Sequence, residues 1–267
     1  VLLGAVNAKY IHSNLAVYSL KAYAEDPAVE IGEYTINQQK DDILMDIYKR
    51  QPDILCLSCY IWNLDYIEEI VLEIGKLRPD MPIWLGGPEV SYHAEEMLEQ
   101  YPFLDGIMKG EGEITFRELA VYYQNQENGT EGKTLEEIHG ITYRDAEGAI
   151  KSNPWRPVMD LSEVDFPYAN LKKFENRIIY YESSRGCPFS CSYCLSSIDK
   201  RLRFRNLELV KKELAFFLEH KVPQVKFVDR TFNCKKDHAM EIWKFIAEHD
   251  NGVTNFHFEI AADLITE

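Results

Sequence analysis

Short apolar runs alternate with amphipathic stretches along the first 125 residues of the chain. The apolar runs lie at 1–6, 31–35, 54–59, 82–85 and 106–108. Between the third and fourth runs, apolar residues recur every three or four positions from Leu64 to Leu77, which predicts a helix with one buried face. Asn63 stands where an N-terminal cap is expected. This alternation predicts a doubly wound α/β domain over residues 1–125, in which ligands bind at the carboxyl ends of parallel strands.

The pattern changes twice beyond this flavodoxin-like domain. Residues 126–173 are rich in polar residues and proline and contain a hairpin-like stretch from Ile141 to Lys151, which predicts a linker with a small β element. A second strand–helix series occupies residues 174–267. Its expected strands are 178–182, 225–228 and 256–260, and its expected helices are 207–220 and 235–249. Since three strands cannot close a barrel, we expect the first part of a partial (β/α) barrel that lacks its C-terminal portion.

Composition narrows the classes of protein that this chain can represent. Of 267 residues, 46% are hydrophobic and 27% are charged, which is typical of a globular protein. The net charge of −15 argues against a partner of duplex nucleic acid, because such binders neutralise phosphates with clustered lysine and arginine. No run reaches the roughly 18 apolar residues that a membrane-spanning helix needs. We therefore expect a cytoplasmic protein with no membrane partner.

Three of the six cysteines lie within eight residues. The segment from Arg185 reads RGCPFSCSYC and places Cys187, Cys191 and Cys194 directly after a predicted strand. Three thiolates without a fourth suit a 4Fe-4S cluster with one open iron, whereas a structural zinc site normally takes four ligands. The alternative is a zinc knuckle completed by Cys234 or a histidine, although a buried small cysteine is the more typical role for Cys234.

With the aromatic Tyr193 just before its last cysteine, this motif resembles that of the radical S-adenosylmethionine (SAM) superfamily. The resemblance implies that the open iron binds the amino and carboxylate groups of SAM. It also implies that an electron from the cluster cleaves SAM to a 5'-deoxyadenosyl radical, which abstracts hydrogen from an unactivated carbon. Besides the cysteines, Tyr193 is the expected SAM-binding residue of this loop.

Three charged residues of the later barrel strands are further candidate SAM contacts. Asp229 and Arg230 lie at the carboxyl end of the second barrel strand and Glu259 lies in the third, where this fold places its chemistry. A carboxylate would hold the ribose hydroxyls or the ammonium group of SAM, and an arginine would hold its carboxylate. The glycine-rich element of the superfamily is replaced here by VDRTFN, and the alternative is that these charges pair with each other.

A basic segment begins six residues after the last cysteine of the motif. It contains Lys200, Arg201, Arg203 and Arg205 in an otherwise acidic chain. Two interpretations stay open: the segment attracts an anionic substrate or flanks the SAM pocket, or it is a solvated loop and helix start.

The combination of a doubly wound domain, a linker and a radical SAM segment resembles the cobalamin-dependent radical SAM class over essentially the whole chain. The resemblance implies cobalamin binding by residues at the strand ends. These are Ser58, the pair Gly86 and Gly87 in LGGPE, and Gly110, Glu111 and Gly112 in KGEGEITF. Glycines there would let a nucleotide tail approach the backbone, but tight turns use glycine as well.

His12 is the candidate lower ligand to cobalt. Domains that coordinate cobalt through histidine carry an Asp-x-His-x-x-Gly motif, and only the histidine is present in the stretch from Tyr10 to Leu15. Without the aspartate, the group that usually orients a ligating imidazole is missing. We therefore expect His12 to be a loop histidine or a hydrogen-bonding contact, with cobalt ligation as the alternative.

Cys56 and Cys59 have the spacing of a redox pair but lie in a predicted buried strand. Because side chains alternate along a strand, a separation of three residues places the two thiols on opposite faces. We predict that both are core residues.

The sequence thus predicts an enzyme with a 4Fe-4S cluster, SAM and cobalamin. Its expected partners are a small-molecule substrate and an electron donor such as flavodoxin or ferredoxin. Methyl transfer is the expected reaction, although the class also performs ring formation and rearrangement. One alternative is a radical SAM enzyme whose first domain binds no cobalamin, and another is a noncatalytic binding module stabilised by zinc or iron. Because the expected barrel is incomplete, we expect residues 1–267 alone not to turn over.

Overall fold

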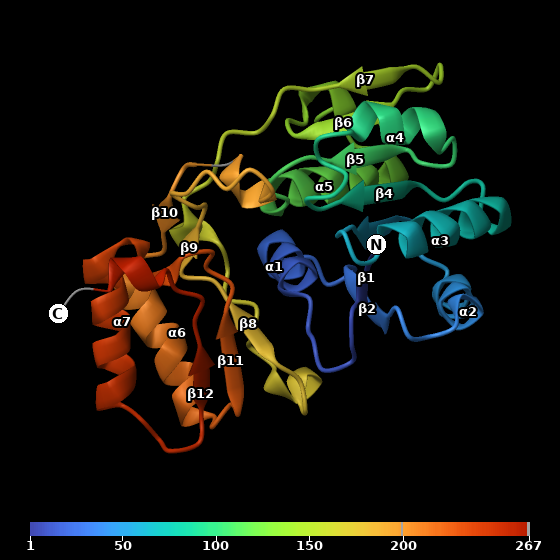
Figure 1. The fold of residues 1–267 in the computed structure, drawn as a ribbon. Helices are drawn as coiled ribbons and strands as arrows, with labels where there is room; N and C mark the ends of the chain where they lie inside the picture. Colours follow the sequence, from blue (N-terminus) through green and yellow to red (C-terminus); the bar gives the residue numbers. More distant parts are fainter. Residues whose placement is uncertain (199, 266–267) are drawn as a thin grey trace. The chain divides into compact units, whose positions relative to one another are not determined.

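The computed structural model describes residues 1–198 and 200–265, and the chain divides into two compact units between Val158 and Met159 (Figure 1). The first unit alternates strands and helices along the sequence. Its elements are β1 (Leu2–Asn7), α1 (Leu15–Ala24), β2 (Glu30–Thr35), α2 (Lys40–Arg50), β3 (Leu55–Ser58), α3 (Leu64–Leu77), β4 (Ile83–Gly86), α4 (Ala94–Gln100), β5 (Gly106–Met108), α5 (Glu113–Asn128), β6 (Ile141–Arg144) and β7 (Ile150–Ser152).

The sheet of the first unit confirms the predicted doubly wound fold. Its strands lie in the order β2-β1-β3-β4-β5-β6-β7, and the first five are parallel. The order 2-1-3-4-5 is that of flavodoxin-like folds. Helix α3 has the bounds predicted from its apolar spacing, and each predicted strand of this unit is correct within one residue at either end.

The hairpin that the sequence placed in a linker extends this sheet. Strand β6 pairs antiparallel with β5, and β7 pairs antiparallel with β6. The reason is apolar burial, since Ile141 and Tyr143 of β6 belong to the same cluster as Phe116 of α5. The hairpin therefore contributes to the core of the first unit.

Apolar clusters cover both faces of the sheet. One contains residues of α2, α3 and α4, and the other contains residues of α1 and α5. Figure 1 shows these helices around the sheet. Cys59 belongs to the first cluster and Cys56 to the second, which confirms that the two thiols occupy opposite faces of the core. Burial raises the pKa of Cys56 to about 12 and raises that of Cys59 further, so neither thiol is poised for redox chemistry.

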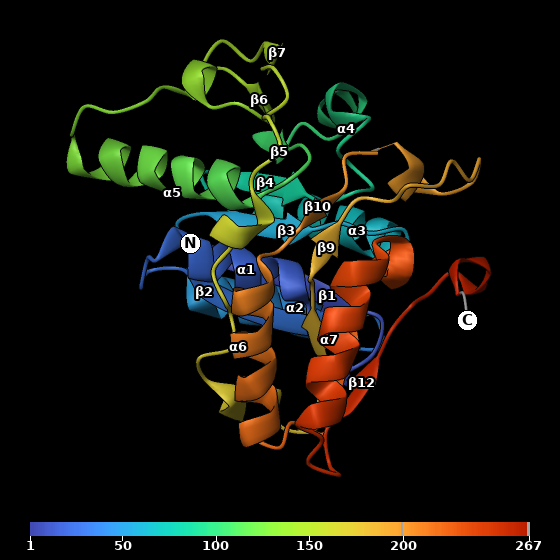
Figure 2. The same cartoon turned by 90° about the vertical axis from the view of Figure 1, so that its left-hand side faces the viewer.

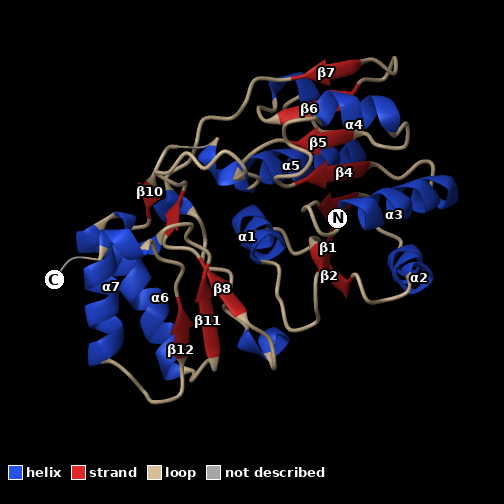
Figure 3. Ribbon diagram, viewed as in Figure 1, coloured by secondary structure: helices blue, strands red, loops and turns tan. Residues whose placement is uncertain are grey.

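The second unit contains a three-stranded parallel sheet in the order β12 (Asn255–His257), β11 (Gln224–Phe227) and β8 (Ile179–Tyr181). Helices α6 (Leu207–Glu219) and α7 (Lys236–Glu248) pack side by side (Figures 2 and 3). Its core is aromatic: Tyr181 packs against both Phe217 and Phe227. Strands β8 and β12 are shorter than predicted, whereas β11 has the predicted length and is displaced by one residue. The unit also contains β9 (Ser184–Arg185) and β10 (Arg203–Phe204).

The longest helix is α5, with 16 residues. Within residues 1–198 and 200–265, no helix has the length and apolar character required to cross a bilayer.

Candidate functional site

The carboxyl ends of β1, β3, β4 and β5 meet at one edge of the first unit, where buried asparagines tie the strand ends together. Asn14 caps α1 through Val17 N and donates from Nδ2 to Ser58 Oγ at 3.3 Å. Asn63 occupies the N-cap position of α3, as predicted, but its side chain makes no capping hydrogen bond to the first turn. Its Nδ2 donates instead to Val6 O at 2.9 Å and to Ser58 O at 3.0 Å. Ser58 is therefore fixed in place by both asparagines.

Gly87 allows the ends of β3 and β4 to approach each other. Its φ is +114°, and a Cβ there would overlap the carbonyl oxygen of Cys59. A Cβ on Gly86 would meet only ordinary contacts with Met108. Ser91 links the next two loops, because its Oγ donates to Gly87 O at 2.8 Å and accepts from Gly110 N at 3.1 Å. Close packing of the backbone thus accounts for Gly87.

The segment that follows β5 contains a buried lysine that the sequence analysis did not single out. Lys109 is 5% exposed, and its Nζ donates to Ser152 Oγ at 2.9 Å and to Asn153 O at 3.0 Å. It also lies 5.5 Å from the centre of the Trp155 ring. Burial lowers the pKa of Lys109. In the sequence, the only indication of a role for this lysine is its position directly before the glycine-rich segment.

The remaining predicted residues of this edge lie in two loops. Gly110 has φ +75°, and Gly112 occupies the N-cap position of α5, with Glu111 half-buried between them. His12 is half-buried in the loop between β1 and α1, and its carbonyl oxygen accepts from Asn7 Nδ2 at 3.1 Å. The structure therefore places these residues and Ser58 in loops or strand ends of the same edge.

Large apolar side chains are exposed in the loops at this carboxyl edge. Each is between 44% and 80% exposed, and we call the set the apolar rim. Its members are Tyr10, Ile11, Ile61, Trp62, Tyr92 and Trp155. Trp62 stacks on Tyr60 with ring centres 4.5 Å apart, and Tyr92 packs against Trp155 at 5.3 Å. Exposed apolar side chains at one edge of a sheet make that edge a candidate binding surface.

In the second unit, the three predicted cluster ligands lie on one loop between β9 and β10. Cys187 is buried at the start of the loop, with its Sγ 3.7 Å from Thr231 Oγ1. Cys191 is exposed and Cys194 is half-buried, and the N–H of Cys194 donates to the carbonyl of Cys191 at 3.1 Å. Tyr193 is 92% exposed. Among the residues described, no three His, Cys, Asp or Glu side chains are gathered closely enough to hold a metal ion.

The three charged candidates for SAM binding have different surroundings. Asp229 is 1% exposed and accepts hydrogen bonds from Ser183 N, Ser183 Oγ and Ser184 Oγ at 3.0, 2.7 and 2.5 Å. Burial raises its pKa to about 6. Arg230 is exposed, and Glu259 is exposed and forms an ion pair with Lys226 at 3.3 Å. Both lie beyond the ends of β11 and β12, respectively.

His238 of α7 completes the polar cluster around Asp229. It is 4% exposed, and its Nε2 lies 3.4 Å from Ser183 Oγ. Burial lowers the pKa of His238 to about 4, so the imidazole is neutral at pH 7. In the sequence, the indication that His238 lies near Asp229 is its position at the start of the helix that follows that residue.

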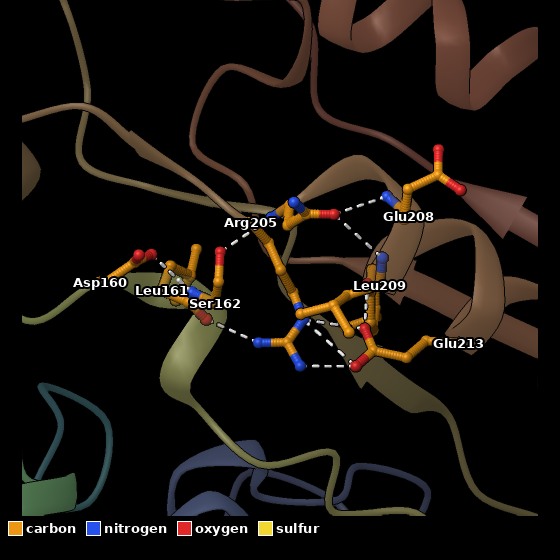
Figure 4. Close-up of polar contacts among 9 residues, drawn as sticks. Asp160, Leu161, Ser162, Arg205, Glu208, Leu209 and Glu213 are labelled. Carbon is orange, nitrogen blue, oxygen red and sulfur yellow. Dashed lines mark hydrogen bonds and ion pairs between the residues drawn. The ribbon is translucent and has the colours of Figure 1, made fainter.

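The basic segment is not a uniform solvated loop, because Arg205 is buried. Its guanidinium forms an ion pair with Glu213 of α6 and donates from Nη1 to Leu161 O at 2.6 Å (Figure 4). Glu213 also accepts from the hydroxyl of Tyr181 at 2.6 Å. For Arg205, burial contradicts the interpretation as part of a solvated loop, because its guanidinium is paired within the second unit.

Comparison with known proteins gives one family match and several relatives. Residues 1–120 match the model of the B12 binding domain. An uncharacterized methyltransferase of Pyrococcus horikoshii is 30% identical over 212 residues, which is 75% of this chain and 44% of that protein. The cobalamin-dependent radical SAM methyltransferase TokK of Streptomyces tokunonensis is 28% identical over 195 residues, which is 68% of this chain and 28% of TokK.

A solved structure shares the fold of the chain. The radical enzyme OxsB, with aqua-cobalamin and S-adenosylmethionine bound, aligns with a TM-score of 0.77 at 24% identity. The alignment covers 100% of this chain and 39% of OxsB. The chain thus spans less than half the length of each of these relatives, and the likeness supports the predicted fold of both units.

Proposed function

We propose that this chain, which resembles cobalamin-dependent radical SAM methyltransferases in sequence, is part of an enzyme that uses SAM, a 4Fe-4S cluster and cobalamin to methylate a small molecule. One observation carries this proposal. Residues 1–120 match a B12 binding domain, and in the same chain a Cys-x3-Cys-x2-Cys loop follows the parallel strand β8 and the short strand β9. Parallel α/β folds bind ligands beyond the carboxyl ends of their strands. We further propose that flavodoxin or ferredoxin donates the electron.

The donor chemistry of the cysteine loop fits the cluster. Cys187, Cys191 and Cys194 offer three thiolates within eight residues, and three ligands leave one iron open for SAM. When bound, the cluster supplies the electron for reductive cleavage of SAM, and methylcobalamin supplies the methyl group. The exposed Arg230 and Glu259 are our candidates for contact with the carboxylate and the ammonium or ribose of SAM. Tyr193 of the cysteine loop is a further candidate.

The carboxyl edge of the first unit supports a cobalamin site. The apolar rim offers exposed aromatic surface to a large planar ring system, and large apolar area with few polar groups is typical of cofactor sites. Gly86, Gly110, Glu111 and Gly112 are our candidates for contact with the nucleotide tail. We propose His12 as a hydrogen-bonding contact and not as a cobalt ligand, because no aspartate stands two residues before it.

Anaerobic reconstitution tests the cluster. The intact chain should take up about four iron and four sulfide ions, because the cluster contains four of each. Alanine at Cys187, Cys191 or Cys194 should abolish uptake, whereas Cys234→Ala is the matched control because that thiol lies outside the motif. Unchanged iron in Cys191→Ala, or zinc in place of iron, would favour the noncatalytic binding module.

A spectroscopic titration with hydroxocobalamin tests the first unit. Trp62→Ala should weaken binding about tenfold, which corresponds to 1.4 kcal/mol. Tyr48→Ala is the matched control, because Tyr48 is 47% exposed on α2 and Trp62 is 48% exposed at the carboxyl edge. If the intact chain binds no hydroxocobalamin, the first unit recognises another ligand and the alternative without cobalamin is correct.

A further inference from the structure

The carboxylate of Asp229 is committed to the segment that precedes the cysteines. Its Oδ2 accepts from the backbone N–H of Ser183, and its Oδ1 accepts from the hydroxyls of Ser183 and Ser184. At 1% exposure, this carboxylate is removed from solvent. A buried carboxylate that loses its hydrogen-bond donors carries a large free-energy cost, so these contacts strongly constrain the two serines.

The two serines stand at the base of the cysteine loop. Ser184 is the first residue of β9, and Cys187 follows it by three positions. Strand β9 pairs with β10 on the far side of the loop, through Ser184 with Phe204 and Arg185 with Arg203. The direction in which the chain enters the cysteine loop is therefore fixed where Asp229 holds β9.

Two further contacts limit movement at this base. His238 Nε2 lies 3.4 Å from Ser183 Oγ, so the hydroxyl contacts both the histidine and the carboxylate. Gly186 has φ +97°, and a Cβ there would lie only 2.6 Å from Arg201 O. The entry to the loop is thus tightly packed, while Cys191 beyond it is exposed.

We propose that Asp229 is a positioning residue for the cysteine loop, which orients Cys187 through Ser183 and Ser184 without touching the cluster or SAM. This inference rests on the proposed function, because it assigns the loop to a cluster. It differs from the expectation that Asp229 binds SAM. Three donors from the serines already bond to its two oxygens, and at 1% exposure the carboxylate presents almost no surface to a ligand.

The test measures cluster affinity in the absence of SAM. In the reconstituted intact chain, Asp229→Asn should require about 10- to 100-fold less chelator to strip half of the iron, the effect typical of groups that orient metal ligands. The electron paramagnetic resonance signal of the reduced cluster should change as well. Asp237→Asn is the matched control, because Asp237 is an exposed acid of the same unit, on α7.

Serine variants keep the test informative if Asp229→Asn folds poorly. The double variant Ser183→Ala with Ser184→Ala retains the carboxylate and should reproduce the loss of iron affinity. If Asp229 acts through the serines, adding Asp229→Asn to that double variant should lower the affinity by much less than it does in the wild type. Full additivity would overturn the proposal.

Two other outcomes would also overturn it. If Asp229→Asn keeps normal iron affinity but binds SAM more weakly, Asp229 is a SAM contact. If the variant binds both iron and SAM as the wild type does, Asp229 neither positions the loop nor contacts SAM. Hydrogen exchange of residues 183–186 in the metal-free protein separates this inference from the proposed function. If the wild type takes up no iron, the proposed function fails. The contact is still tested there, because exchange that is no faster in Asp229→Asn than in the wild type contradicts it.

Discussion

Removing one partner of the Arg205–Glu213 ion pair should destabilise the second unit strongly. Both side chains are 7% exposed, and the guanidinium donates to Glu213 from Nε at 2.9 Å and from Nη2 at 2.5 Å. Glu213→Ala leaves these donors and the hydroxyl of Tyr181 buried without the carboxylate. Breaking a buried pair in this way costs about 3–5 kcal/mol in the free energy of unfolding.

Removing both charges should cost less than the two single changes together. In Arg205→Met with Glu213→Leu, the carbonyl of Leu161 and the hydroxyl of Tyr181 lose a partner, but no unpaired charge remains. We expect the losses of unfolding free energy in Arg205→Met and in Glu213→Leu to add up to about 2–3 kcal/mol more than the loss in the double variant. This is the upper range of coupling for residues in contact.

Hydrogen exchange of the α6 amides, measured at increasing urea concentrations, reports the free energy of unfolding of the second unit alone. A separate probe is needed because a chain of two units need not unfold in one step. The control is Glu241→Ala, which removes the exposed partner of Lys211 and should leave the unfolding of α6 nearly unchanged. If Glu213→Ala destabilises α6 no more than Glu241→Ala does, the reasoning about the buried pair is wrong.

Two more predictions concern backbone strain and pH. Gly87→Ala should destabilise the first unit by more than the roughly 1–3 kcal/mol of an unfavourable φ alone, because the new Cβ overlaps Cys59 O. Gly129→Ala, with φ +64° and open space, is the control, and equal melting temperatures would contradict the overlap. For His238, a folded-state pKa of about 4, below the 6.5 of the unfolded chain, means that its share of the stability, at most about 3 kcal/mol, is present above pH 6.5 and lost as the pH falls toward 4. Asp229 acts in the opposite direction, since its raised pKa of about 6 makes stability fall as the pH rises from 4 to 6. In urea titrations, His238→Gln should therefore remove the loss on acidification, and an unchanged pH dependence would contradict the buried neutral imidazole.

The sequence predicted the elements whose signal is local. Helix α3 and strand β5 have their predicted bounds, because apolar spacing and a short apolar run define them without reference to the rest of the chain. The opposite faces of Cys56 and Cys59 followed from the alternation of a strand. The place of the hairpin β6–β7 in the sheet required knowledge of which strand edge was open, and local pattern carries no such information.

The polar contacts of the candidate sites were harder to predict because their partners lie far apart in the sequence. Asp229 meets Ser183 across 46 residues, and Asn63 meets Val6 across 57. Asn63 resembled a helix cap because it precedes an amphipathic run, but buried strand ends offered its side chain other acceptors. In both cases the residue stands where a parallel strand ends, so the topology of the sheet, once known, brings the partners together.

The two core thiols of the first unit can report separately on local opening of the helices on either face of the sheet. Cys56 lies beneath α1 and α5, and Cys59 lies beneath α2, α3 and α4. A thiol reagent reaches either one only when the helices above it separate locally from the sheet. Once the accessible cysteines are blocked, the relative labelling rates of Cys56 and Cys59 measure how often each helical layer opens. If a ligand that binds the carboxyl edge is then added, a lower labelling rate at one cysteine or at both shows whether it reduces local opening on one face of the sheet or on both.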